Sequence, residues 1–244
     1  MRLPRLYGEF ADWYYLLTHP DDYEEEAGIF HATFQEHARR PIRTMLELGS
    51  GGGANAMYLK AHYEMTLSDL SEQMLAQSKT INPELRHVLG DMRTLRLGET
   101  FDAVFLHDAV CYMTTEDDLL AAITTAAVHL EPDGIVLMVP DDTTETYIPL
   151  EEEGGHDIGD RSLRYTQQHA PLEPGATSVE MRFTYVLREG GTEREIEDTH
   201  IFGCFPRAMW LRLIEAAGLE SLALPYTHSD FEQPREMFVG FKPG

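Results

Sequence analysis

Short apolar stretches alternate with helix-like patterns through the first 140 residues of the chain. The apolar stretches predict strands at 44–48, 63–69, 85–89, 101–106 and 135–139. Apolar residues recur at helical spacing over 54–61, 72–81 and 116–130. Strands that alternate with helices are typical of an α/β fold built on a parallel sheet. An earlier helix is expected from a cap at Asp21 or Asp22 to about residue 39, with Glu24, Glu25 and Glu26 on its outer face.

The hydrophobic pattern changes after residue 140. Polar and apolar residues alternate over 161–166, 178–188 and 193–202, with Pro174-Gly175 and Gly190-Gly191 between them. This period of two predicts antiparallel strands, which we expect to form a sheet inserted over a ligand site. The acidic, glycine-rich stretch 151–159 is expected to be a flexible loop. A last helix over 208–217 and a hairpin of 218–224 with 237–241 complete the pattern.

These patterns divide the chain into four parts. They are an N-terminal helical cover at 1–40, an α/β core at 41–140, an inserted antiparallel β lid at 141–204, and a C-terminal helix and hairpin at 205–244 that complete the core. Within the cover, residues 7–18 carry five aromatic side chains. We expect this segment either to close the site or to pack on a sheet through Phe10, Trp13, Tyr14 and Leu17.

A cluster of glycines joins the first predicted strand to the next helix. Gly49, Gly51, Gly52 and Gly53 allow positive φ angles and let a ligand approach the main chain, while the first amides of the helix stay free for polar ligand groups. Asp69 ends the second strand, where a carboxylate can accept the hydroxyls of a ribose. Spacing alone therefore indicates a nucleotide site and leaves a dinucleotide as one candidate ligand.

Glu47 precedes this turn, and Glu47-Leu-Gly49-Ser-Gly51-Gly-Gly53 resembles the first motif of class I S-adenosylmethionine (SAM) methyltransferases. The β insertion and the Ala11-Asp-Trp-Tyr14 segment resemble glycine N-methyltransferase and the sugar N,N-dimethyltransferases of macrolide pathways. The resemblance implies a Rossmann-like seven-stranded sheet, in which an antiparallel strand lies between the fifth and sixth. It also implies SAM as cofactor and S-adenosylhomocysteine as its product.

The family resemblance assigns cofactor contacts to residues at the ends of the predicted strands. The glycine turn and Glu47 would lie at the amino-acid end of SAM, and Asp91 would bind the adenine amine. Met74 would cover the adenine face or pack in the core. The full set of expected cofactor-binding residues is Glu47, Gly49, Gly51, Gly53, Asp69, Leu70, Met74, Asp91, Met92 and His107.

Methyl transfer from a sulfonium depends more on how the protein positions the two reactants than on catalytic side chains. His107, at the end of the fourth strand, is the first candidate for a base, although a structural histidine is equally expected there. Tyr14 and Tyr112 are expected to contact the sulfonium or methyl region. No HxH pair or carboxylate cluster indicates a metal site. A nicotinamide oxidoreductase and a noncatalytic SAM-binding protein remain the alternatives.

The formal net charge of −23 disfavours nucleic acid and anionic membrane as partners, which leaves a small-molecule acceptor. Asp141, Asp142 and Glu151 to Glu153 give the expected entrance a negative charge, which favours a cationic amine. Cys111 and Cys204 are too few for a disulfide framework, and no segment is typical of a signal peptide or membrane span, so we expect a cytoplasmic protein. A homodimer is one expectation for its assembly.

Overall fold

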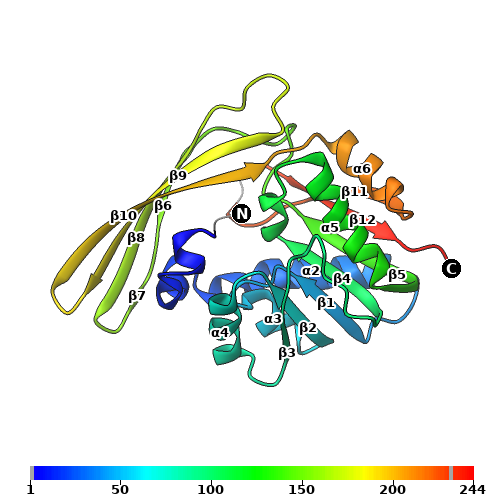
Figure 1. Ribbon diagram of the computed structural model, residues 1–244, viewed down its shortest axis with the longest axis horizontal. Coiled ribbons are helices and arrows are strands. Elements are labelled where there is room, and N and C mark those ends of the chain that lie inside the picture. The colour runs from blue at the N-terminus through cyan, green and yellow to red at the C-terminus, as the bar shows by residue number, and fades with distance from the viewer. Residues whose placement is uncertain (1–2, 231–232) are drawn as a thin grey trace.

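The computed structural model describes residues 3–230 and 233–244, and its centre is a seven-stranded sheet (Figure 1). The order across this sheet is β11-β12-β5-β4-β1-β2-β3. Strands β1 to β5 pair in parallel, whereas β12 is antiparallel to both β5 and β11. The predicted fold class is therefore confirmed, including the antiparallel strand. The bounds are β1 Thr44–Leu48, β2 Glu64–Asp69, β3 Arg86–Leu89, β4 Phe101–His107, β5 Leu130–Val139, β11 Glu220–Tyr226 and β12 Arg235–Phe241.

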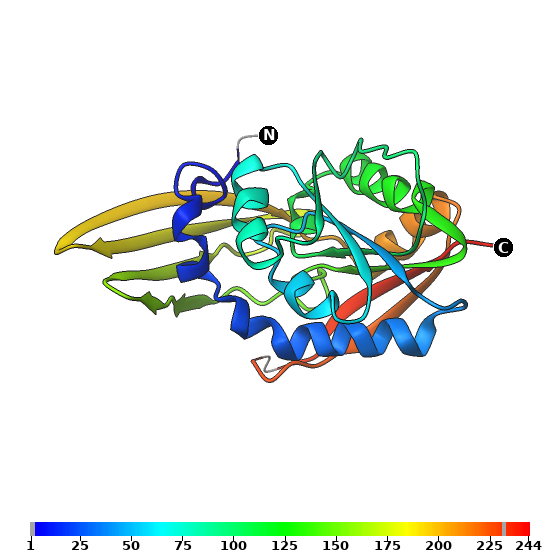
Figure 2. The same cartoon turned by 90° about the horizontal axis from the view of Figure 1, so that it is seen from below.

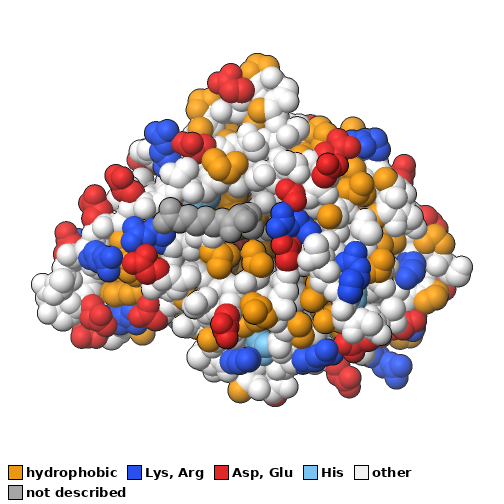
Figure 3. Space-filling model, viewed as in Figure 1, with side chains coloured by type: hydrophobic (Ala, Val, Ile, Leu, Met, Phe, Trp, Pro, Cys, Tyr) orange, Lys and Arg blue, Asp and Glu red, His pale blue; other side chains and the backbone are white. Residues whose placement is uncertain are grey.

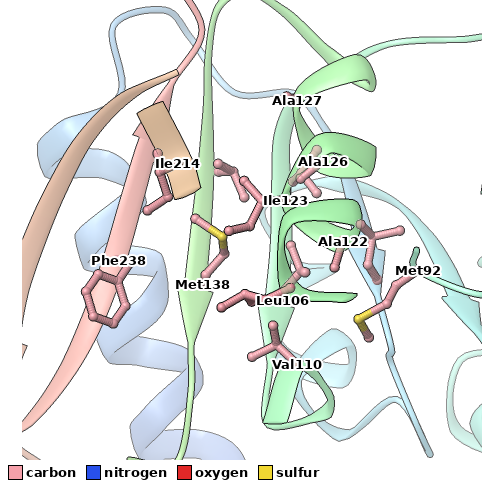
Figure 4. Packing of buried hydrophobic residues seen from close by; sticks show 14 of the residues in the cluster. Met92, Leu106, Val110, Ala122, Ile123, Ala126, Ala127, Met138, Ile214 and Phe238 are labelled. Atoms are coloured by element: carbon pink, nitrogen blue, oxygen red, sulfur yellow. The ribbon is translucent and has the colours of Figure 1, made fainter. Parts of the chain in front are cut away.

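Helices cover both faces of this sheet and bury its apolar side chains. On one face, α5 (Glu116–Val128) and α6 (Arg207–Ala216) pack on a cluster that includes Leu106, Ile123 and Met138 (Figure 4). On the other face, α2 (Glu24–His37) and α3 (Ala54–Leu59) pack on a second cluster, and α2 runs along the sheet in Figure 2. Two-sided cover explains why the strands are almost continuously apolar. None of the helices in the described ranges is both long and apolar enough to cross a membrane.

The alternating segments form a second, antiparallel sheet that projects from the core (Figure 1). Its strands are β6 Glu151–Gly154, β7 Asp157–Ile158, β8 Arg161–His169, β9 Ser178–Glu189 and β10 Thr192–Gly203. The predicted flexible loop at 151–159 is wrong, because β6 and β7 both pair with β8. The side chains of Glu151 to Glu153 are exposed at the edge of this sheet, where charges disfavour pairing with another chain.

The N-terminal segment joins the two sheets. Its short helices are η1 Arg5–Tyr7, η2 Ala11–Trp13 and α1 Tyr14–Leu17, in place of one amphipathic helix. Leu6, Phe10 and Trp13 are buried against the second sheet, so the packing expected of Phe10 and Trp13 is observed. The next turn also differs from the prediction, because η3 (Pro20–Tyr23), capped by His19, precedes α2, which starts at Glu24. η4 (Ala109–Tyr112) follows β4, and α4 (Glu72–Ile81), capped by Ser71, follows β2.

Candidate active site

A cavity of about 680 Å³ lies between the carboxyl ends of the central strands and one face of the second sheet. The glycine turn and the ends of β2 to β4 form one end of it, and the N-terminal tyrosines and strands β8 to β10 form the other. All the residues predicted to be catalytic or to bind the cofactor line this cavity except Gly53, which caps α3. This size is typical of small-molecule sites.

The glycine turn at the base of the cavity has no room for larger residues. Gly49 has a φ of 79°, and a Cβ placed there would lie 2.5 Å from the Cβ of Ala109 and 2.7 Å from the Cε of Met92. The ring of Tyr14 likewise packs directly on Gly52. The turn therefore presents bare main chain to a ligand.

We expect Gly49→Ala to lower the free energy of unfolding by about 2 to 4 kcal/mol, because positive φ and steric overlap both oppose the added methyl group. Gly98→Ala is the matched control, since Gly98 has a φ of 74° but a Cβ added there would meet no atom within 4 Å. Urea unfolding of both variants measures the difference. Equal losses would show that the contact with Ala109 and Met92 is unimportant.

Asp69 and Asp91 stand at the ends of β2 and β3. Asp69 accepts hydrogen bonds from the main-chain N–H groups of Gly51 and Ser71, both at 2.8 Å, and burial raises the pKa of its carboxyl. Asp91 pairs with the side chain of Arg93, whose hydrogen bonds lower the pKa of Asp91. Each carboxylate has two oxygens and several lone pairs, so both retain acceptor capacity toward the cavity.

We expect Asp69→Ala to weaken cofactor binding by about 1 to 3 kcal/mol, the usual effect of removing a partner of buried hydroxyl groups. Glu64→Gln, at the exposed opposite end of β2, is the control and should leave affinity unchanged. Calorimetric titration with S-adenosylhomocysteine measures both. Wild-type affinity in the Asp69 variant would contradict the ribose assignment.

Glu47 places a buried carboxyl beside the glycine turn. The residue is 3% exposed, and its Oε2 has no hydrogen-bond partner in the described structure. Burial raises its pKa to about 8. An unpartnered buried carboxyl is costly unless a ligand satisfies it. Its position therefore fits a ligand that carries a positive charge.

His107 ends β4 within a group of polar side chains. Its Nε2 lies 3.0 Å from Asp108 Oδ1 and 3.5 Å from Glu26 Oε2, and its Nδ1 lies 3.1 Å from Asn55 Nδ2. Burial alone would lower the pKa of His107, but the charges of Asp108 and Glu26 outweigh it and raise the pKa to about 10. A pKa raised this far by neighbouring acids does not favour His107 as the base that frees the amine.

Asp108, next to His107, is another carboxylate that lines the cavity. Its φ of 41° is rare for a residue other than glycine, and such strain is typical of functional positions. Its side chain is 53% accessible, through the cavity that it lines. Asp141 interacts with it directly: burial and the charge of Asp108 raise the pKa of Asp141, whereas the charge of His107 lowers the pKa of Asp108.

Aromatic side chains form the far wall of the cavity. The ring of Tyr7 lies 5.9 Å from that of Tyr14 and 6.0 Å from that of Tyr112, in edge-to-face contacts. The Tyr112 hydroxyl is 2.9 Å from Nδ1 of His200, which β10 contributes. The structure thus brings Tyr14 and Tyr112 together, although they lie far apart in sequence. Neither hydroxyl is acidic, because burial raises the pKa of both.

Sequence reasoning missed several residues of this site. Glu26 was expected on the outer face of its helix, but Asn55 donates a 2.9 Å hydrogen bond to it and it faces His107. The spacing of four between Glu26, Phe30 and Phe34 was the available signal, because both phenylalanines are fully buried. Tyr7 belonged to the aromatic segment expected to close the site but was not named individually, and no local pattern marked Asn55 or His200. Glu151 to Glu153, expected at the entrance, are not among the residues that line the cavity.

Comparison with known proteins agrees with this arrangement. Residues 45–134 match a methyltransferase-domain family. The chain is 32% identical over 180 residues, 72% of its length and 75% of the relative's, to the dTDP-3-amino-3,4,6-trideoxy-alpha-D-glucopyranose N,N-dimethyltransferase of Streptomyces venezuelae. It is 27% identical over 222 residues to a dTDP-3-amino-3,6-dideoxy-alpha-D-glucopyranose N,N-dimethyltransferase of Streptomyces fradiae, covering 89% of this chain and 86% of that one.

Solved structures support the same relationship. The crystal structure of Streptomyces venezuelae DesVI superposes with a TM-score of 0.82, 25% identity and coverage of 97% of this chain and 98% of that chain. The SAM-bound amino pentose methyltransferase CalS10 shares the fold, with a TM-score of 0.76, 24% identity and coverage of 90% of this chain and 91% of that one.

The fold, the cavity and these relatives together define a class I SAM-dependent methyltransferase. The chain belongs to the family that includes the amino-sugar N,N-dimethyltransferases. It is therefore a transferase that uses SAM and acts on a small molecule, and neither the nicotinamide oxidoreductase nor the noncatalytic alternative is supported. The unpartnered carboxyl of Glu47, the bare glycine turn and the acceptor oxygens of Asp69 fit this cofactor.

Proposed function

We propose that this enzyme methylates the amino nitrogen of a small, sugar-like acceptor. The observation that supports an amine most directly is the Asp108–Asp141 pair, which lies beyond the cofactor end of the cavity and next to His107. Carboxylates attract an ammonium group and can take a proton from it. The names of the relatives, which methylate amino sugars, agree with this choice of atom.

In the cofactor half, we propose that the glycine turn and Glu47 hold the amino-acid end, Asp69 the ribose, and Asp91 the adenine amine. Leu70, Met74 and Met92 line the same half and supply apolar contacts. When bound, SAM supplies a methyl group on a positively charged sulfur, which an amine nitrogen takes up by in-line displacement. The other residues prepare the acceptor.

An amine reaches the enzyme mostly as an ammonium ion, which has no free lone pair. Asp108 lines the cavity and can accept one N–H proton from this ion. The neutral amine then has the lone pair it needs, and the methylated product regains a positive charge. Protonated His107 holds Asp108 in place through the 3.0 Å contact, so we propose a positioning role for it. Tyr14 and Tyr112 shape the space for the methyl group and acceptor.

Transfer of radiolabelled methyl from SAM to a panel of amines, phenols and carboxylates tests this proposal. We expect labelled product, with equimolar S-adenosylhomocysteine, only from primary and secondary amines. Turnover of phenols or carboxylates without any amine would overturn the choice of nitrogen. Binding of S-adenosylhomocysteine, measured separately, shows that the protein used is folded.

We also propose that the enzyme works in the cytoplasm on free small molecules. Cys111 and Cys204 are both buried thiols, which suits a reducing compartment. Lys and Arg side chains are interspersed with Asp and Glu over the described part of the face in Figure 3, so this face offers no continuous basic strip for nucleic acid. A homodimer stays a prediction, which sedimentation at several protein concentrations measures.

A further inference from the structure

The cavity has an unusual distribution of charge. Among the described residues that line it, none is Lys or Arg, whereas its acids are Asp22, Glu47, Asp69, Asp91, Asp108 and Asp141. Asp91 is paired with an arginine behind the lining, Arg93. The histidines of the lining are His107, His156 and His200, and His107 is already paired with acids. A ligand in this cavity therefore meets acidic side chains at both ends and, among the described residues of the lining, no Lys or Arg.

The acceptor half combines these acids with aromatic rings. Asp108 and Asp141 share this half with aromatic side chains of the N-terminal segment, η4 and the second sheet, among them Tyr7, Tyr112, Phe183 and Tyr185. Aromatic faces attract cations and offer nothing to an anion. A carboxylate pair within such a wall selects a protonated amine.

The neighbouring cations do not reverse this charge. Arg235 is already engaged with acids: burial raises the pKa of Asp141 and Asp142, and the charge of Arg235 counters that rise. Arg5 borders an adjoining hollow of about 570 Å³, but that hollow also contains Glu197 and Asp198, and the Arg5 side chain pairs with Glu9. Within the described ranges, neither arginine offers the cavity a forked, unopposed guanidinium group of the kind that binds a diphosphate.

The named relatives act on sugars carried by dTDP, whose diphosphate is anionic. We infer that this enzyme differs from them in its acceptor, which is a cationic amine without a phosphate or nucleotide carrier. This inference rests on the proposed N-methylation. The acid pair and the aromatic wall would hold the ammonium group, and the acids would repel a nucleotide-linked sugar.

A matched pair of acceptors tests the inference. The methyl glycoside of 3-amino-3,6-dideoxyglucose and the same amino sugar linked to dTDP are compared by the rate of S-adenosylhomocysteine release. We expect at least a tenfold higher kcat/KM for the glycoside, and a KM for the glycoside that rises with added salt as screening weakens the attraction. Calorimetry with dTDP, in the presence of S-adenosylhomocysteine, should show no binding at millimolar concentration.

Variants test whether the acids of the cavity cause the preference for the glycoside over the dTDP-linked sugar. Asp108→Asn, which removes the charge that would attract the ammonium group, should raise the KM of the glycoside at least fivefold and reduce its advantage over the dTDP-linked sugar. Asp160→Asn, at the exposed turn between β7 and β8, is the control and should leave that ratio unchanged. An equal or higher kcat/KM for the dTDP-linked sugar, or micromolar binding of dTDP, would overturn this inference but leave the proposed N-methylation intact. Methylation of oxygen acceptors with no amine turned over would instead overturn the proposed function, and the inference with it.

Discussion

Asp108→Asn is expected to lower kcat/KM for an amine acceptor by about 100-fold to 10 000-fold at pH 7, the usual contribution of a positioned proton acceptor. The asparagine keeps the size of the side chain but can neither take a proton nor attract an ammonium ion. The Oδ1 of the asparagine can still accept the hydrogen bond of His107, and the charge of Glu26 remains 3.5 Å away. Binding of S-adenosylhomocysteine should therefore change little.

The pH dependence of this variant separates proton transfer from simple positioning. At higher pH the acceptor loses its proton in solution, so the activity of Asp108→Asn should rise about tenfold per pH unit until the amine is neutral. Wild-type activity should rise much less over the same range. Asp117→Asn, on the exposed side of α5, controls for loss of charge alone. A deficit that stays constant from pH 7 to the amine pKa would rule out Asp108 as the proton acceptor.

Glu47 is expected to make cofactor binding depend on pH. Because its pKa is about 8 without ligand, the carboxyl is mostly protonated at pH 6 and must ionise to meet a positively charged group. We expect the Kd of S-adenosylhomocysteine to fall by up to about tenfold per unit as pH rises from 6 to 8, with proton release on binding. Titrations in buffers of different ionisation enthalpy measure that release.

Glu47 should also affect stability without ligand. Its folded pKa lies above the unfolded value, so its neutral form stabilises the fold at low pH, and this stabilisation is lost as pH rises from about 4.5 to about 8. Glu47→Gln should remove this slope and flatten the pH dependence of binding, whereas Glu64→Gln should alter neither. Unchanged proton release in Glu47→Gln would show that another group ionises when the cofactor binds.

The cofactor half of the site could be predicted from sequence because its signals are local. Strand, glycine turn and helix occupy one continuous stretch, and Asp69 and Asp91 follow directly after strands whose carboxyl ends meet at one edge. The acceptor half depends on contacts between distant segments. His200 reaches Tyr112 only because β10 folds back over η4, and no spacing along the chain encodes that pairing.

The errors in secondary structure have similar causes. The stretch 151–159 has the composition of a loop, yet β8 supplies hydrogen-bonding partners that override this preference. Glu26 was assigned to solvent together with its charged neighbours, although it shares a helix face with Phe30 and Phe34. The composition of each segment reflects only its own residues, whereas contacts with distant parts of the chain determined the structure that each segment adopts.

The N-terminal segment is attached to both halves of the molecule. Tyr15 places its hydroxyl 2.8 Å from the carbonyl oxygens of Gly52 and Gln77, and Ser71 donates a hydrogen bond to the carbonyl of Tyr7. A few residues away, Leu6, Phe10 and Trp13 are buried in the second sheet. The N-terminal segment therefore contacts the glycine turn at the cofactor end and the sheet at the acceptor end, so a movement of this segment would open both ends together. The two substrates are therefore expected to enter and leave in a fixed kinetic order, cofactor first and its demethylated remnant last.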